Sequence, residues 1–333
     1  LTMRTKTRSG QSNLERGQAA LAESSSRIRN LIATEDIEEI YNADQTGINH
    51  EYIPKTTTDG AGSKIVGIRC SGHEKDRITA MLLADTKGTK CPMFLVLQSK
   101  ASKIKEKLVE SLTQQTAFGP VVWPEIQELH ERYPSRLYGK PTAWWSSEIS
   151  KDSLTYHFGH RKGHDLKKFL LLWDDFSAHF CDEVVACAAT MNVFLEKIPP
   201  TFTWMCQPAD VAWVKPMKSA RERWVTYLRH EIENHKNDEG IFQLRRPSRF
   251  DLVEWVNEAW EALPKATIVR GFVKCNLIDV KKNVPSEAVL SANNNRQATD
   301  EIASLLQQLD IHDVCYDEVV DTFDYIDVGA DIE

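Results

Sequence analysis

Residues 169–175 have the sequence FLLLWDD, in which five apolar residues are followed by two carboxylates. A continuous apolar run of this length is typical of a β-strand that is buried on both faces of a parallel sheet. Residues 182–192 have a helical pattern, and residues 193–198 form a second strand candidate that ends before Pro199 and Pro200. The segment therefore predicts a β-α-β unit with a parallel crossover.

Shorter strand candidates precede this unit. They occupy residues 37–44, 65–70, 78–84 and 92–97, with turn residues between them. Short connections of this kind predict an antiparallel meander. Residues 100–165 are instead charged, aromatic and helical in patches. The chain as a whole predicts an α/β fold in which the meander and the parallel unit lie beside each other.

Three aspartates stand where these elements end. We expect Asp44 to close the first strand and Asp174 to close the buried strand, while Asp210 lies just before a helix over residues 218–236. Carboxylates at the ends of adjacent strands converge on one edge of a sheet, and hard divalent cations prefer such oxygen ligands. One aspartate at a strand end is more often a turn or helix-capping residue. The three together favour a site for two cations that act on a phosphodiester.

Four sequence blocks resemble, in order, the motifs of DDE superfamily endonucleases of the pogo branch, which includes jerky-like proteins and centromere protein B. The blocks are NADQTGINHEYIP (42–54), SGHEKDRITAMLLADTKGTKCPMFLVL (71–97), LLLWDDFSAHF (170–180) and TWMCQPADVAWVKPMK (203–218). The resemblance covers roughly residues 37–227, and residues 255–276 carry a weaker similarity.

This resemblance implies an RNase H-like fold: a mixed five-stranded sheet flanked by helices, with a helical C-terminal extension. It also implies metal-dependent cleavage and strand transfer of DNA, with transposon ends and target DNA as partners and a homodimer as a possible assembly. Asp44, Asp174 and Asp210 take the places of the catalytic, metal-binding acids, and the cofactors are two divalent cations, Mg²⁺ or Mn²⁺. The 36 positions between the last two acids are typical of the family.

The second acid has to be chosen between two neighbours, Asp174 and Asp175. Adjacent residues at a strand end point to opposite faces, and the family pattern of a hydrophobic residue before the acid selects Asp174. His179 is expected either to make a structural hydrogen bond in the following turn or to touch DNA or assist a proton transfer. Gln45 and Gln207 flank the acids and are expected to orient them.

Four residues are candidates for contact with DNA. Trp144 and Trp145 precede a helix, where they either pack in the core or stack on a DNA end. Lys215 and Lys218 flank the start of the long helix, where they either reach phosphates or form an ordinary solvated face. Two weaker signals are set aside: His157, His160 and His164 as a zinc site, and residues 60–64 as a phosphate-binding loop.

The net charge of −7 is unevenly distributed. Residues 290–333 contain eleven acidic residues and one basic residue, so the rest of the chain has a small positive excess that is compatible with a polyanionic partner. No apolar run approaches the roughly 20 residues of a membrane span, and the N-terminus lacks the apolar segment of a secretory signal. Seven scattered cysteines indicate reduced thiols. Together with the resemblance, these features predict a nuclear protein.

We expect five parts along the chain. They are a basic linker (1–30), the endonuclease domain (31–236) with a helical and aromatic insertion (100–165), a helical extension (237–290) and an acidic, partly disordered tail (291–333). The chain then begins in the linker that follows the family's N-terminal helix-turn-helix region. The main alternative is an inactive or domesticated module that binds DNA or protein without cutting, and a third hypothesis is a ribonuclease of RNase H type.

Overall fold

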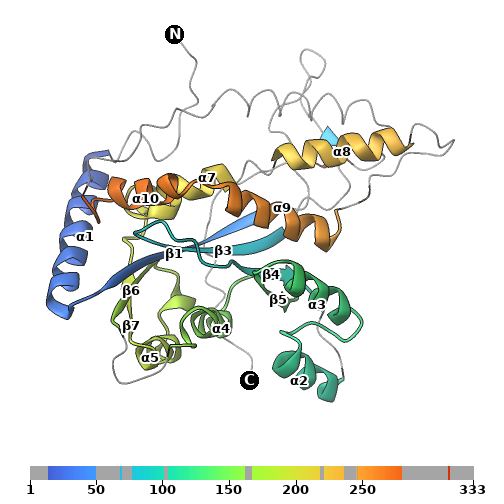
Figure 1. Ribbon diagram of the computed structural model, residues 1–333, viewed down its shortest axis with the longest axis horizontal. Coiled ribbons are helices and arrows are strands. Elements are labelled where there is room, and N and C mark those ends of the chain that lie inside the picture. Colours follow the sequence, from blue (N-terminus) through green and yellow to red (C-terminus); the bar gives the residue numbers. More distant parts are fainter. Residues whose placement is uncertain are drawn as a thin grey trace, which may run out of the picture.

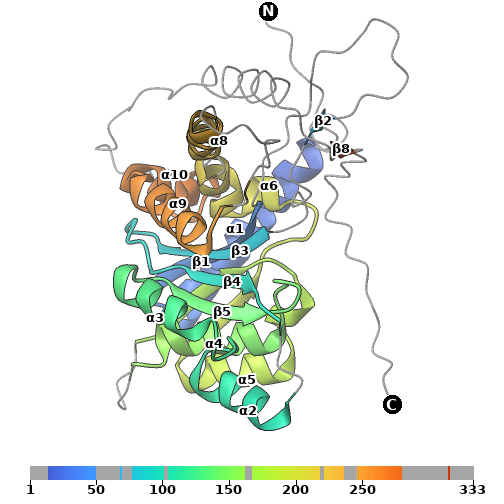
Figure 2. The same ribbon diagram turned by 90° about the vertical axis from the view of Figure 1, so that its right-hand side faces the viewer.

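The computed structural model describes residues 14–49, 68–69, 77–100, 104–161, 167–217, 221–235, 245, 247–279 and 314–315. Helices cover both faces of a central β-sheet, so the described part has three layers (Figures 1 and 2). The helices over one face are α7 (Val214–Met217), α9 (Arg249–Ala262) and α10 (Lys265–Lys274), with α8 (Arg221–His235) beyond them. Those over the other face are α4 (Ser147–Phe158) and α5 (Asp182–Thr190).

The central sheet has six strands in the order β5-β4-β3-β1-β6-β7. Their bounds are β1 (Glu39–Asn49), β3 (Arg77–Asp85), β4 (Phe94–Gln98), β5 (Arg136–Lys140), β6 (Phe169–Trp173) and β7 (Val193–Lys197). β3 is antiparallel to both of its neighbours, β1 and β4, and the remaining pairs are parallel. The antiparallel meander β1-β3-β4 and the parallel unit β6-α5-β7 are therefore confirmed, and with them the RNase H-like fold.

The sixth strand, β5, differs from the five strands expected. It lies in the insertion and pairs in parallel with β4, with Leu95 opposite Leu137. The insertion also supplies α2 (Lys105–Gln114) and α3 (Trp123–Arg132). In the structure β5 buries alternate residues, but it has only five residues, RLYGK. So short a segment cannot be distinguished from a loop by sequence alone.

β1 is longer than predicted, and this changes the place of Asp44. The strand continues for five residues beyond Asp44, to Asn49, because residues 45–49 pair with residues 77–81 of β3. Asp44 therefore lies within the strand and not at its end. The buried, β-branched Thr46 suits this continuation, but the pairing itself depends on a strand that is distant in the sequence.

The two faces of the sheet bury alternate residues of each strand. On β3, Ile78, Ala80 and Leu82 belong to the core beneath α9 and α10, whereas Met81 and Leu83 belong to the core above α4 and α5. This period of two is what a strand buried on both faces produces. On β1 the same rule puts residues 40, 42 and 44 toward the α9 and α10 face.

The remaining elements complete the edges of the body. α1 (Leu14–Glu35) stands along the β7 edge of the sheet (Figure 1), where Arg27 pairs with Glu196 at 2.6 Å. From Leu14 onward, the segment expected to be a linker is thus a helix packed on the body. The short turn η1 (Ser177–His179) lies between β6 and α5, and two further short turns, α6 (Thr203–Cys206) and η2 (Ala209–Trp213), connect β7 to α7.

The helical extension is firmly attached to the sheet. α9 begins with a capping box formed by Ser248 and Asp251, and it buries Val256 and Trp260 in the core. The ammonium group of Lys90 donates to the carbonyl oxygens of Trp260 and Glu261 at 2.7 Å, which satisfies the C-terminal end of the helix. The predicted extension is therefore part of the core of the domain.

The N-terminal 13 residues and most of the acidic tail lie outside the described residues. From the tail, only β8 (Val314–Cys315) is described, and it pairs with β2 (Ile68–Arg69) in a separate two-stranded sheet. The expectation that the tail is partly disordered therefore stays a prediction.

Candidate active site

Asp44 is the most deeply buried of the three acids, with an exposed fraction of 6%. Burial is the largest cause that raises the pKa of its carboxyl group well above the ordinary value, and the nearby carboxylates of Asp210 and Asp174 raise it further. Asp210 also shares a hydrogen bond with the Asp44 side chain, while the backbone N–H of Gln45 acts in the opposite direction. Asp44 is therefore protonated more readily than an ordinary aspartate.

Asp174 follows the last residue of β6. The β1–β6 register pairs Asn42 with Leu172, so two further residues along both strands bring Asp174 beside Asp44, with about 4.8 Å between the strands. One carboxylate oxygen, Oδ1, is buried and makes no well-formed hydrogen bond within the described part of the chain. Nε2 of His179 lies 3.1 Å from this oxygen, in a close polar contact.

Asp175 points away from the acids. Its Oδ1 lies 2.8 Å from Nζ of Lys197 on β7, in a half-exposed ion pair. This placement agrees with the alternation expected at a strand end.

Asp210 is exposed and lies on η2, a short π-helical turn that is not part of the sheet. Contacts on two sides hold this turn. The backbone N–H of Ala209 donates to Oδ1 of Asn42 on β1 at 2.9 Å. On the other side, a Cβ on Gly271 of α10 would lie 2.6 Å from the carbonyl oxygen of Pro208, so only glycine permits this close approach. The turn is thereby fixed between the sheet and α10.

The three acids are close enough to influence one another, yet they are not arranged as a finished metal site. Within the residues that the structure describes, no group of three or more His, Cys, Asp or Glu side chains is placed so that it could hold a metal ion. The donor set nevertheless fits a hard divalent cation, because carboxylate oxygens are its preferred ligands and the carboxylates of Asp210 and Asp174 lie close enough to raise the pKa of Asp44. A cation would also relieve the repulsion that raises the pKa of Asp44.

His179 is completely buried, which excludes the contact with DNA that its position had allowed. Its ring stacks on Trp173 at a centroid distance of 3.8 Å. Nδ1 lies 3.0 Å from Oγ of Ser150, and that oxygen accepts a hydrogen bond from Nε1 of Trp145. The Ser150 hydroxyl can therefore donate to Nδ1, which leaves the proton of the neutral ring on Nε2, toward Asp174. Burial lowers the pKa of His179, in agreement with a neutral ring.

The two flanking glutamines differ in their surroundings. Nε2 of Gln45 lies 3.3 Å from Nε2 of His179 on the α4 side of the sheet. With the ring proton on Nε2 both nitrogens are donors, so this approach is a packing contact and not a hydrogen bond. Gln207 is fully buried, and among the described residues neither atom of its side-chain amide has a hydrogen-bond partner. Its predicted role in orienting the acids stays a prediction.

We expect His179→Ala to reduce the free energy of unfolding by about 2–5 kcal/mol, because it removes a stacked ring and leaves buried polar groups without a partner. Urea denaturation followed by tryptophan fluorescence measures this change. His230→Ala, on the exposed surface of α8, is the matched control and should leave the midpoint nearly unchanged. Equal midpoints for the two variants would show that His179 is not part of the folded network.

The four DNA-contact candidates are placed differently. Trp144 is 58% exposed, and the guanidinium carbon of Arg77 lies 3.9 Å from the centroid of its ring. Trp145 is 5% exposed and contacts Phe94 edge to face, so it packs in the core and cannot stack on DNA. Lys215 is exposed on α7, and Lys218 lies outside the described residues.

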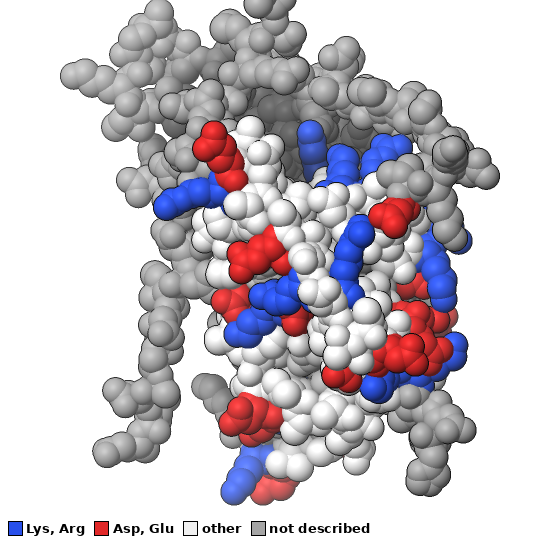
Figure 3. Space-filling model, turned by 90° about the vertical axis from the view of Figure 1, so that its left-hand side faces the viewer, with Lys and Arg blue, Asp and Glu red and all other residues white. Residues whose placement is uncertain are grey.

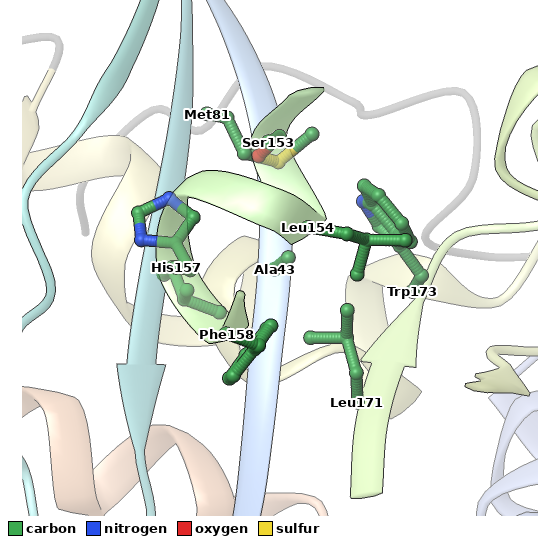
Figure 4. A pocket seen from close by; sticks show the side chains of 9 residues that line it. Ala43, Met81, Ser153, Leu154, His157, Phe158, Leu171 and Trp173 are labelled. Atoms are coloured by element: carbon green, nitrogen blue, oxygen red, sulfur yellow. The ribbon is translucent and has the colours of Figure 1, made fainter. Parts of the chain in front are cut away.

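A small, mainly apolar pocket lies between α4 and the sheet (Figure 4). It is lined by Ala43, Met81, Leu83, Ser153, Leu154, His157, Phe158, Leu171 and Trp173. Burial lowers the pKa of His157 to about 4, so the ring is neutral, and its Nε2 has no hydrogen-bond partner among the described residues. Because the side chains of Ala43 and Asp44 point to opposite faces, this pocket is separate from the acids.

Sequence analysis missed Asn42 and Ser150, which hold the site without being acids. Asn42 lies two residues before Asp44, so the period of two could have placed it on the same face as that acid. Ser150 lies in the insertion, and no feature of the sequence connects it with His179.

Residues 75–272, more than half of the chain, match the family model described as DDE superfamily endonuclease. The chain belongs to this family, as the four motif blocks predicted. It is similar to a "Pogo transposable element with KRAB domain" of Homo sapiens, with 27% identity over 244 residues that cover 73% of this chain and 36% of that protein. It is also similar to "CENP-B homolog protein 2" of Schizosaccharomyces pombe, with 25% identity over 246 residues that cover 72% and 42% of the two chains. The chain thus spans less than half the length of these relatives.

Among solved structures, the chain is similar to the "Mos1 transposase paired-end complex with left transposon end", with 12% identity and a TM-score of 0.45. The match covers 83% of this chain and 64% of that one. The "Crystal structure of the catalytic domain of Mos1 mariner transposase" matches at 14% identity and a TM-score of 0.33, over 83% of this chain and 93% of that one.

Proposed function

We propose that this chain is the catalytic part of a transposase that cleaves and transfers DNA strands, with Asp44, Asp174 and Asp210 as ligands of two divalent cations, Mg²⁺ or Mn²⁺. The observation that supports it most is the electrostatic coupling of a buried carboxyl group, Asp44, to two other carboxylates brought together from three segments. Buried acids whose pKa is raised by like charges are characteristic of catalytic sites.

Each acid has a distinct part in this proposal. Two divalent cations, when bound, stabilise the attacking water and the leaving oxygen of the phosphodiester. A bound cation would favour the ionised form of Asp44, because positive charge lowers the pKa of a neighbouring carboxyl group. Asp174 keeps its orientation through His179, whose ring is fixed by Ser150 and Trp173. Asp210, the exposed member, faces the entering strand.

The proposed partners are DNA, namely transposon ends and target, and a second copy of the chain. Trp144 is the proposed stacking surface for a base and Lys215 a proposed phosphate contact, because both are exposed. The face seen in Figure 3 has Lys and Arg side chains interspersed with Asp and Glu, so no uniformly basic surface for DNA is apparent there. A nuclear location follows from DNA as substrate, and none of the described helices is long and apolar enough to span a membrane.

The catalytic unit in this proposal comprises α1, the sheet, α9 and α10, which share one core, together with α4 and α5, which form the second core on the other face of the same sheet. A domesticated module that binds DNA without cutting it is the alternative function. The observation that favours it is that no metal-holding group of three side chains is formed among the described residues.

A nicking assay on supercoiled DNA, in parallel with an RNA–DNA hybrid, tests the function directly. We expect nicking of DNA that requires Mg²⁺ or Mn²⁺ and little cleavage of the hybrid. DNA binding without nicking in either metal would favour the domesticated module, and preferential cleavage of the hybrid would favour a ribonuclease.

A further inference from the structure

Asn42 is a buried residue on β1, the strand that carries Asp44. Its side chain also contacts the two other segments that carry the acids, the end of β6 and the turn η2. It has no exposed surface and lies on β1, two residues before Asp44. Its Nδ2 donates to the carbonyl oxygen of Leu172, two residues before Asp174, at 3.0 Å. A longer contact of 3.4 Å joins the same nitrogen to the carbonyl oxygen of Ala43. Its Oδ1 accepts the backbone N–H of Ala209, the residue before Asp210, at 2.9 Å.

These contacts matter because the third acid does not lie on a strand of the sheet. Asp44 and Asp174 are held relative to each other by the parallel ladder between β1 and β6, whereas Asp210 lies on the π-helical turn η2. The position of η2 relative to β1 therefore depends on side-chain contacts. The hydrogen bond between Asn42 and Ala209 joins η2 directly to β1. An amide is well suited to this place, since it donates to one backbone and accepts from another without adding charge beside three carboxylates.

We propose that Asn42 is a positioning residue that sets the separation of Asp210 from Asp44 and Asp174, and thereby the affinity of the site for divalent cations. The proposal rests on the function proposed above. Outer residues that orient metal ligands typically change metal affinity by about 10–100-fold when they are replaced.

The test is Asn42→Leu, which keeps the branched shape of the side chain and removes both hydrogen bonds. Mn²⁺ binding to the full chain, followed by electron paramagnetic resonance of free Mn²⁺, should be weakened about 10–100-fold. The matched control is Asn257→Leu on α9, where a similarly buried amide donates to Val253 at 2.7 Å and accepts from Ser135 at 2.6 Å. Both variants should lose thermal stability, but Asn257→Leu should bind Mn²⁺ as the wild type does.

Hydrogen exchange in the wild type gives a second measurement that needs no variant to fold. Mg²⁺ should slow exchange of the Ala209 amide, because a fixed Asp210 keeps the bond to Asn42 closed. The proposal is overturned if Asn42→Leu binds Mn²⁺ as the wild type does, or if exchange at Ala209 does not respond to Mg²⁺. A wild type that binds neither cation would instead refute the proposed function, and the role of Asn42 with it.

Discussion

Asp174→Asn is expected to lower the metal-dependent nicking of DNA by at least about 10³-fold, since the metal ions are asked to supply several kcal/mol of transition-state stabilisation. The substitution keeps the size of the side chain and removes one ligand charge. His179 remains in its buried network, because the amide oxygen of Asn can still lie near Nε2. The loss should therefore appear in the rate of nicking and not in the folding of the protein.

Asp175→Asn is the matched control, one residue further along the chain. It loses only a half-exposed ion pair with Lys197, and such pairs contribute at most about 1 kcal/mol. We expect its nicking rate to stay within about threefold of the wild type. A Mn²⁺ titration of both variants side by side measures the difference, and equal loss in the two would mean that the choice of Asp174 over its neighbour is wrong.

Asp44→Asn is expected to make the metal-free protein more stable. The pKa of Asp44 in the folded state is raised above its ordinary value of 3.8, so the folded protein holds this proton more tightly than the unfolded chain does. The stability that comes from the proton is fully present below about pH 3.8 and is lost as the pH rises through the raised folded value. Because Asn does not titrate, the variant avoids this loss.

The gain should grow with pH by up to about 1.4 kcal/mol per pH unit across that window. Urea denaturation of both proteins from pH 4 to pH 8, without metal, measures it. With added Mg²⁺ the wild type should become the more stable of the two proteins. The cation stabilises the wild type by mass action, and the variant has one ligand fewer to bind it. A wild type that is the more stable of the two at pH 7 without metal would show that burial and the neighbouring carboxylates do not raise the pKa of Asp44.

Much of the fold follows from short-range pattern. Sequence analysis predicts β6, α5 and β7 because each segment has a hydrophobic pattern of its own and residues that end it. Strand pairing is harder to predict from sequence. β1 continues beyond Asp44 because its residues 45–49 pair with residues 77–81 of β3. The strand β5 is likewise made by its pairing with β4 and not by its own composition.

In the candidate site, too, some residues stand out in the sequence and others do not. Its three proposed acids stand out in the sequence, because charged residues beside buried strands are conspicuous and the resemblance of the motif blocks selects them. Their supports do not stand out, because Trp145, Ser150 and His179 form one buried chain only after the insertion folds against β6. Exposure separates Trp144 from Trp145 in the same way: two adjacent tryptophans have equal signals in the sequence and opposite environments in the fold.

The central claim is that three aspartates from β1, the end of β6 and η2 hold the catalytic cations. Anomalous X-ray diffraction from crystals of the protein grown with Mn²⁺ tests it most directly, because Mn²⁺ can be located without reference to the surrounding atoms. We predict strong anomalous density between the carboxylates of Asp44, Asp174 and Asp210, with none at Asp175. Density at another group of side chains, or none at saturating Mn²⁺, would contradict the assignment.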